Sequence, residues 1–198
     1  MSHSSDIQAT FIEAGAVDDD AISTAAAVGN NAAMTLTTSP YVPDQPRKIT
    51  LHSAGNSSGI SFTVVGLDET GAAATESITG GNAGSVTSTK YYSSVTSITA
   101  VGNPTGDQKA GISASIAAPI FRGDLRMRGM YAVNTASAGT INFTQGSASG
   151  ASQLKFNTVA AANSTEYPSI PQDGIVFRSG GYVVYDVANL SSITVFYA

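Results

Sequence analysis

The feature that most constrains this chain is an alternation of apolar and polar residues that recurs between clusters of Gly and Asn. Ile49 and Leu51 alternate with polar neighbours in one run, and Phe62 and Val64 do so in the next. The segment between them, residues 53–59, is rich in Gly, Asn and Ser, which supply the backbone conformations that a hairpin loop needs. Short runs of this kind, spaced by about ten residues, predict an all-β sandwich or barrel.

The β pattern divides into two parts. A cluster of turn residues at 102–107 interrupts it, and a regular pattern restarts at Leu125. We therefore expect an all-β chain with two tandem β-sandwich or jelly-roll-like domains. The expected parts are an extended N-terminal arm or linker over residues 1–30, a first β-domain over 31–120 and a second β-domain over 121–198. Within the arm, Asp20 to Val28 could form a short helix with Asp20 as its N-cap, although that length is marginal for an isolated helix.

Composition excludes several classes of protein. The hydrophobic content of 42% and the net charge of -5 argue against a disordered chain, and no apolar run reaches the roughly 18 residues of a membrane span. The acidic balance argues against a nucleic-acid surface, and the absence of Cys excludes disulfides. The N-terminus lacks a basic and apolar signal sequence. Charged residues make up only 12% of the chain, so we expect its surface to be covered by neighbours in an assembly.

Few residues carry the chemistry of catalysis or metal binding. His3 and His52 are far apart and give too few ligands for a metal centre. Residues 55–59 match the pattern G-x-S-x-G, but no His follows them, so we interpret them as a turn. The Asp run at 18–20 could ligate Ca²⁺, cap a helix or form a solvated charge cluster. We expect a chain without enzymatic activity and predict neither a cofactor nor a metal.

Three of the nine basic residues, Arg122, Arg126 and Arg128, lie within a short stretch. Arg126 and Arg128 are separated by one residue, so they project from the same face of a strand. One interpretation is a solvated strand face. The other is a basic strip that docks on an acidic neighbour, because Arg pairs well with carboxylates.

Tyrosines occur close together at two places in the chain. Tyr91 and Tyr92 are neighbours, and Tyr182 and Tyr185 flank two valines. Alternation along a strand places one ring of an adjacent pair outside the domain core. Exposed Tyr is typical of protein interfaces, so we predict that these four residues bind a partner together with the three arginines. A sugar-binding platform is the alternative.

Several longer stretches of the sequence carry motifs that can be compared with those of known protein families. They cover residues 49–56, 58–68, 75–84, 88–92 and 95–99 in the first half, and 125–131, 139–143 and 193–197 in the second. Their motifs, such as Ser58-Gly59-Ile60 and Ile193-Thr194-Val195, are β-turn and strand patterns without catalytic residues. Together they resemble parts of virion proteins of tailed bacteriophages, notably marine and cyanobacterial ones.

The resemblance implies a non-enzymatic structural protein of the virion, assembled in the cytoplasm of a bacterial host. It favours a capsid decoration (cement) protein that forms a homotrimer and binds the major capsid protein or other virion subunits, with the N-terminal arm ordering on a neighbour. The same resemblance leaves open a neck, collar or tail accessory ring. The alternative from another class is a carbohydrate-binding adhesive module at a fibre base.

Overall fold

The computed structural model describes residues 7–198, and these residues form strands and no helix. The prediction of an all-β fold of the sandwich type is therefore confirmed. None of the described elements is an apolar helix long enough to cross a membrane. The chain divides into two compact units: the first is Ala16–Ala114, and the second combines Ser115–Ala198 with the described part of residues 1–15.

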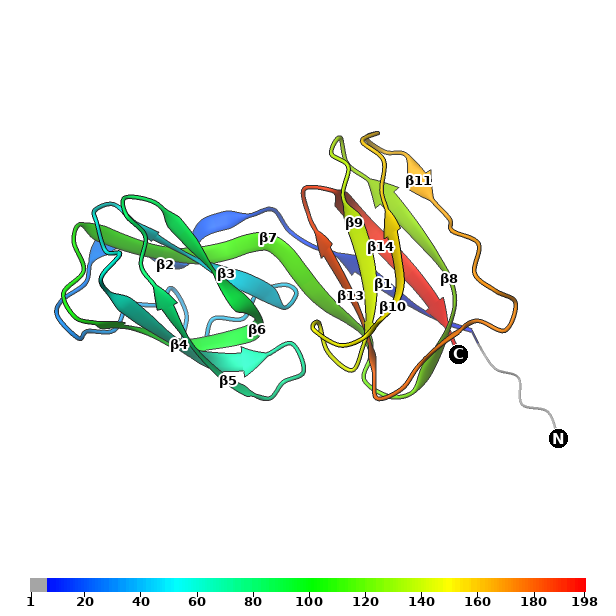
Figure 1. Cartoon of the computed structure of the whole chain (residues 1–198), viewed down its shortest axis with the longest axis horizontal. Helices are drawn as coiled ribbons and strands as arrows, with labels where there is room; N and C mark the ends of the chain where they lie inside the picture. The colour runs from blue at the N-terminus through cyan, green and yellow to red at the C-terminus, as the bar shows by residue number, and fades with distance from the viewer. Residues whose placement is uncertain (1–6) are drawn as a thin grey trace. The chain divides into compact units, whose positions relative to one another are not determined.

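The strands of the first unit belong to one hydrogen-bonded sheet of nine strands, in which one long strand pairs with two neighbours. Its strands are β2 (Asp18–Ala27), β3 (Arg47–Ser53), β4 (Ser61–Asp68), β5 (Ala73–Thr79), β6 (Ser85–Val101) and the beginning of β7 (Asp107–Phe121). The first part of β6 pairs with β3, and its remainder, from Tyr92 onward, pairs with β4 (Figure 1). Ile49 of β3 and Phe62 of β4 belong to one buried cluster, which is the hydrophobic core of this unit.

The second unit contains a five-stranded sheet and the remaining strands of the nine-stranded sheet. The five-stranded sheet has the order β1-β14-β8-β11, with β12 also paired to β8. The part of the nine-stranded sheet in this unit consists of β10, β9, β13 and the end of β7. The bounds are β1 (Gln8–Glu13), β8 (Leu125–Asn134), β9 (Thr140–Gln145), β10 (Ser152–Asn157), β11 (Thr165–Glu166), β12 (Ile175–Phe177), β13 (Gly181–Asp186) and β14 (Leu190–Tyr197). Met127 and Ile193 of the first sheet and Phe143 of the second belong to one buried core.

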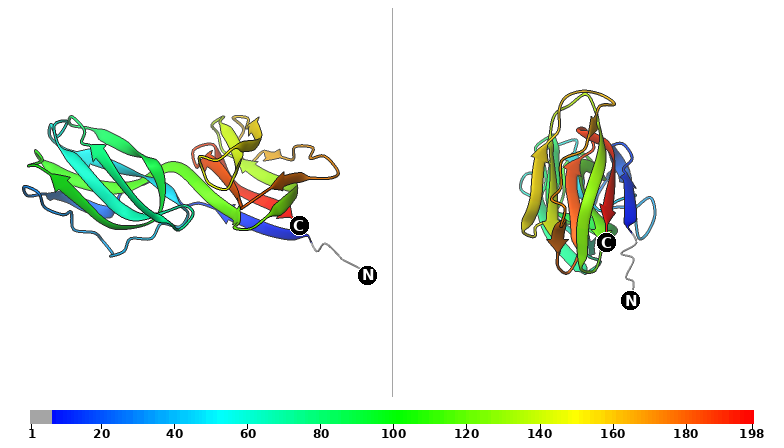
Figure 2. Two further views of the ribbon diagram at one scale, coloured as in Figure 1. Left: turned by 60° about the horizontal axis from the view of Figure 1, so that its bottom comes forward. Right: turned by 90° about the vertical axis from the view of Figure 1, so that its right-hand side faces the viewer.

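The prediction of an extended arm over residues 1–30 is wrong for its described part. Gln8–Glu13 forms strand β1, which pairs with β14 and belongs to the second unit, as the adjacent blue and red strands of Figure 2 show. The physical reason is alternation: Ile12 is buried in the core, whereas Phe11 is exposed. Residues 1–6, including His3, lie outside the described residues.

The suggested helix over Asp20–Val28 is also wrong, because Asp18–Ala27 is strand β2, paired with β7. Backbone pairing with β7 and burial of Ile22 outweigh the weak helix propensity of this segment. Gly111 of β7 makes the close approach possible: a Cβ built there would lie 2.1 Å from the carbonyl oxygen of Asp18. The units divide at residues 114 and 115 instead of near residue 120, because β7 contributes to both.

Candidate functional site

The outward face of the sheet β1-β14-β8 carries exposed aromatic side chains. In the ladder, Thr194 of β14 lies between Phe11 of β1 and Tyr131 of β8. One step along, Phe196 pairs with Gly129, and its ring lies over the space that a side chain would fill there, 3.7 Å from a Cβ built on the glycine. The exposed fraction is 62% for Phe11 and 37% for Phe196, whereas their strand neighbours Ile12, Val195 and Tyr197 are buried.

Tyr167 extends this surface from the segment after β11. Its ring lies 5.3 Å from that of Tyr131 at an interplanar angle of 57°, a tilted arrangement that aromatic pairs favour. Thr165 donates a hydrogen bond of 3.0 Å to the Tyr167 hydroxyl, yet 67% of Tyr167 stays exposed. We call Phe11, Tyr131, Tyr167 and Phe196 the aromatic face. Large exposed aromatic side chains gathered on one sheet are typical of binding surfaces.

The predicted basic strip lies beside the aromatic face. Arg126 and Arg128 project from β8 and reach the loop between β11 and β12. Arg126 Nη1 donates to the carbonyl oxygen of Asp173, and Arg128 Nη1 donates to that of Gln172 at 3.1 Å. Each guanidinium has five N–H donors, so fastening this loop leaves donors for a partner. Arg122 is exposed in the turn between β7 and β8.

A fourth arginine, Arg178, joins these three through the fold. It follows β12, whose Phe177 pairs with Leu125 at the start of β8. The neighbouring Ser179 donates its N–H to Asp124 at 2.7 Å, and a Cβ built at Gly180 would lie 3.7 Å from Cα of Arg122. We call Arg122, Arg126, Arg128 and Arg178 the arginine end. It holds four of the nine basic residues, and sequence reasoning missed Arg178 because only the pairing of β12 with β8 brings it there.

The prediction that the four tyrosines form an exposed partner-binding set is wrong for three of them. Tyr92, Tyr182 and Tyr185 are all buried, and Tyr92 and Tyr185 belong to the hydrophobic cores of the first and the second unit. Only Tyr91 is partly exposed, and its ring lies 5.3 Å from the ammonium nitrogen of Lys48. Burial raises the pKa of Tyr92, and the nearby carboxylate of Glu76, 3.5 Å from its hydroxyl, raises it further.

The G-x-S-x-G match at residues 55–59 is part of a turn with a structural hydrogen-bond network. Ser57 is fully buried, and its hydroxyl accepts the N–H of Thr105 at 3.2 Å. Gln108 donates to the carbonyl oxygen of Gly106 at 2.9 Å and accepts from Ser53 at 2.6 Å. His52 instead lies 3.1 Å from the hydroxyl of Ser85. The buried Ser57 therefore joins loops of the first unit.

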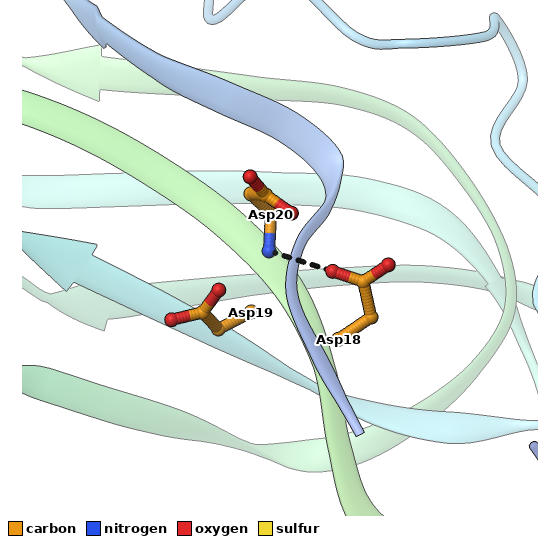
Figure 3. A group of neighbouring side chains, drawn as sticks. All are labelled: Asp18, Asp19 and Asp20. Carbon is orange, nitrogen blue, oxygen red and sulfur yellow. Dashed lines mark hydrogen bonds between the residues drawn. The ribbon is translucent and has the colours of Figure 1, made fainter. Parts of the chain in front are cut away.

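The three aspartates at 18–20 gather at the beginning of β2 (Figure 3), and one carboxylate oxygen from each lies within 4.8 Å of the others. Asp19 forms an ion pair of 2.5 Å with Lys109, and a hydrogen bond from this lysine lowers the pKa of Asp19. Asp18 raises the pKa of Asp20 through hydrogen bonding and like charge. All three side chains are exposed. The geometry is that of a solvated cluster with one lysine partner.

No protein-family model and no curated protein matches this chain. The resemblance to virion proteins therefore rests on the sequence stretches alone.

Proposed function

We propose that this chain is a non-enzymatic structural subunit of a tailed-phage virion, with capsid decoration as its position in the particle. The observation that carries the proposal is the joint exposure of the aromatic face and the arginine end on the second unit. Exposed aromatic rings next to arginines form the residue combination that protein interfaces favour. The major capsid protein or another virion subunit is the proposed partner.

Support also comes from how the reactive side chains are used. The hydroxyl of Ser57 and the amide of Gln108 form hydrogen bonds that join loops. The carboxylate of Glu76 accepts two hydrogen bonds from Thr89, one from its N–H at 2.7 Å and one from its hydroxyl at 2.9 Å. These polar groups hold strands and turns of the first unit in place. A stable β framework that presents an exposed surface fits a component whose work is binding other subunits.

The test is immunogold electron microscopy of purified particles with an antibody raised against this chain. Gold distributed over the capsid shell is the expected result. Gold at the junction of head and tail would overturn decoration in favour of a neck or collar ring. Particles without label, when an antibody to the major capsid protein labels them, would overturn the virion assignment altogether.

One observation favours a second candidate, a carbohydrate-binding adhesive module. The tilted pair Tyr131 and Tyr167 exposes ring surface beside hydroxyl-bearing residues such as Thr165, and sugars stack on surfaces of this kind. A glycan-array signal that is lost in Tyr167→Ala and kept in Tyr91→Ala would favour this function. Equal binding by the wild-type protein and Tyr167→Ala would contradict it.

A further inference from the structure

Charge is divided unequally between the two units. The first unit contains eight carboxylate and four basic side chains, so its net charge is -4. The described residues of the second unit contain five of each, so its net charge is zero. Most of the positive charge of the second unit lies at the arginine end, where Asp124 and Asp173 are the neighbouring acidic residues.

Apolar side chains accompany the arginines, as a docking surface requires. Phe121 precedes Arg122 and is 43% exposed, and Val176 of β12 pairs with Arg126 and is partly exposed. The guanidinium of Arg178 is exposed and has no hydrogen-bond or ion-pair partner among residues 7–198. The arginine end thus combines apolar area with the guanidinium of Arg178, which is available to carboxylates of another surface.

We propose that the arginine end of one copy docks on the acidic first unit of a second copy of this chain. The charges are complementary, because a surface with four arginines meets a unit with a net charge of -4. The contact joins two different surfaces, so it is heterologous. It closes into a ring, such as a trimer, when the successive rotations from one copy to the next add up to a full turn. The inference deepens the proposed function by naming the partner of the arginine end, and it rests on that function only for the place of the ring in a virion.

The first test compares two single charge reversals in the purified full-length chain by sedimentation velocity. Arg178→Glu and Lys155→Glu change the net charge equally, and both residues are exposed in the second unit. We expect Arg178→Glu to raise the dissociation constant of self-association about tenfold or more and Lys155→Glu to change it less than about twofold. A wild-type chain that stays monomeric up to about 100 μM, or equal effects of the two reversals, would overturn the proposal.

The second test asks whether the acidic side of the contact is the first unit. Asp20→Lys reverses a charge in that unit and leaves the ion pair of Asp19 with Lys109 in place. Alone it should weaken association, whereas the combined variant Asp20→Lys with Arg178→Glu should associate more strongly than the product of the two single effects allows. The measurement is made at low salt, where charges interact over longer distances. If the effects of the two single substitutions on the dissociation constant simply multiply in the combined variant, the first unit is not the partner surface.

The outcomes separate this inference from the proposed function. Self-association that fails while antibody labels the particles would overturn the ring and leave the virion assignment standing. If self-association depends on Arg178 but the protein is absent from particles, the virion assignment is overturned and the contact between copies stands. Circular dichroism of each variant shows that the strands are intact.

Discussion

At the scale of single residues, the turn between β4 and β5 shows how a carboxylate stabilises this fold. Asp68 Oδ1 accepts three hydrogen bonds: from the N–H of Thr70 at 2.8 Å, from the hydroxyl of Thr70 at 2.6 Å and from the N–H of Ala72 at 3.0 Å. Burial alone would raise the pKa of Asp68, but these hydrogen bonds favour the charged form and lower its pKa below the ordinary value. Asp and Gly favour turns, and both occur in this one.

This turn makes a pH-dependent prediction. A carboxyl group with a lowered pKa in the folded state contributes stability above its ordinary pKa of about 4 and loses it as the pH falls through the folded-state value. We expect Asp68→Asn to lower the free energy of unfolding at pH 7, and the difference from the wild type to shrink at about pH 3. Urea denaturation of both proteins at the two pH values measures this. A difference that grows in acid would contradict the role of Asp68.

The arginines and tyrosines show what sequence could and could not predict about the site. The spacing of Arg126 and Arg128 correctly placed them on one face of a strand, and both remain partly or fully exposed. The tyrosines were misjudged because period-two alternation says which side a ring takes, not whether the chain itself covers that side. Tyr92 and Tyr182 are both buried, although alternation alone allowed one of each pair to be exposed. Arg178 required a long-range strand pairing.

At the scale of elements, regular alternation identified strands that have β-branched or aromatic residues on their buried side. Strand β3 is an example, with Ile49 and Leu51 buried between less buried neighbours. Strand β2 escaped detection because it is mainly Asp, Ala, Ser and Thr and buries little beyond Ile22 and Ser23. Its conformation comes from pairing with β7, which is a tertiary contact that local propensity does not contain.

The antiparallel pairing of β4 with β6 gives a prediction at this scale. The pairing shifts register at Gly66, and a Cβ built there would lie 2.0 Å from the carbonyl oxygen of Ser94. We expect Gly66→Ala to cost about 2 kcal/mol of unfolding free energy, because the strands must separate to admit the methyl group. Gly59→Ala is the matched control, since nothing lies within 4 Å of a Cβ at that position. Chemical denaturation measures both, and equal stabilities would contradict the close approach.

At the scale of the whole molecule, the order of the chain does not follow the order of the units. Strand β1 comes first in the sequence but completes a sheet with β14, which comes last. Strand β7 contributes residues to both units. A sequence pattern read from one end to the other therefore predicts tandem domains, whereas the structure divides the chain at two places, after residue 15 and after residue 114.

This arrangement predicts that a core substitution in β1 weakens the second unit. Ile12 is 2% exposed and belongs to the core of that unit, so Ile12→Ala should lower its unfolding free energy by about 3 kcal/mol. Phe11→Ala, on the exposed side of the same strand, should change it by less than about 0.5 kcal/mol. Hydrogen exchange resolved by residue is the measurement. If Ile12→Ala speeds exchange more in β3 and β4 than in β8 and β14, relative to the wild type, this assignment of β1 is contradicted.

The most direct test of a role in the virion is the number of copies per particle, measured by quantitative mass spectrometry against the major capsid protein. A decoration protein on the capsid shell should be present on the order of hundreds of copies per particle, in a fixed ratio to the shell subunits. A count near roughly six or twelve would contradict decoration and indicate a single ring at the neck or tail. Purified particles without peptides of this chain would contradict the virion role itself.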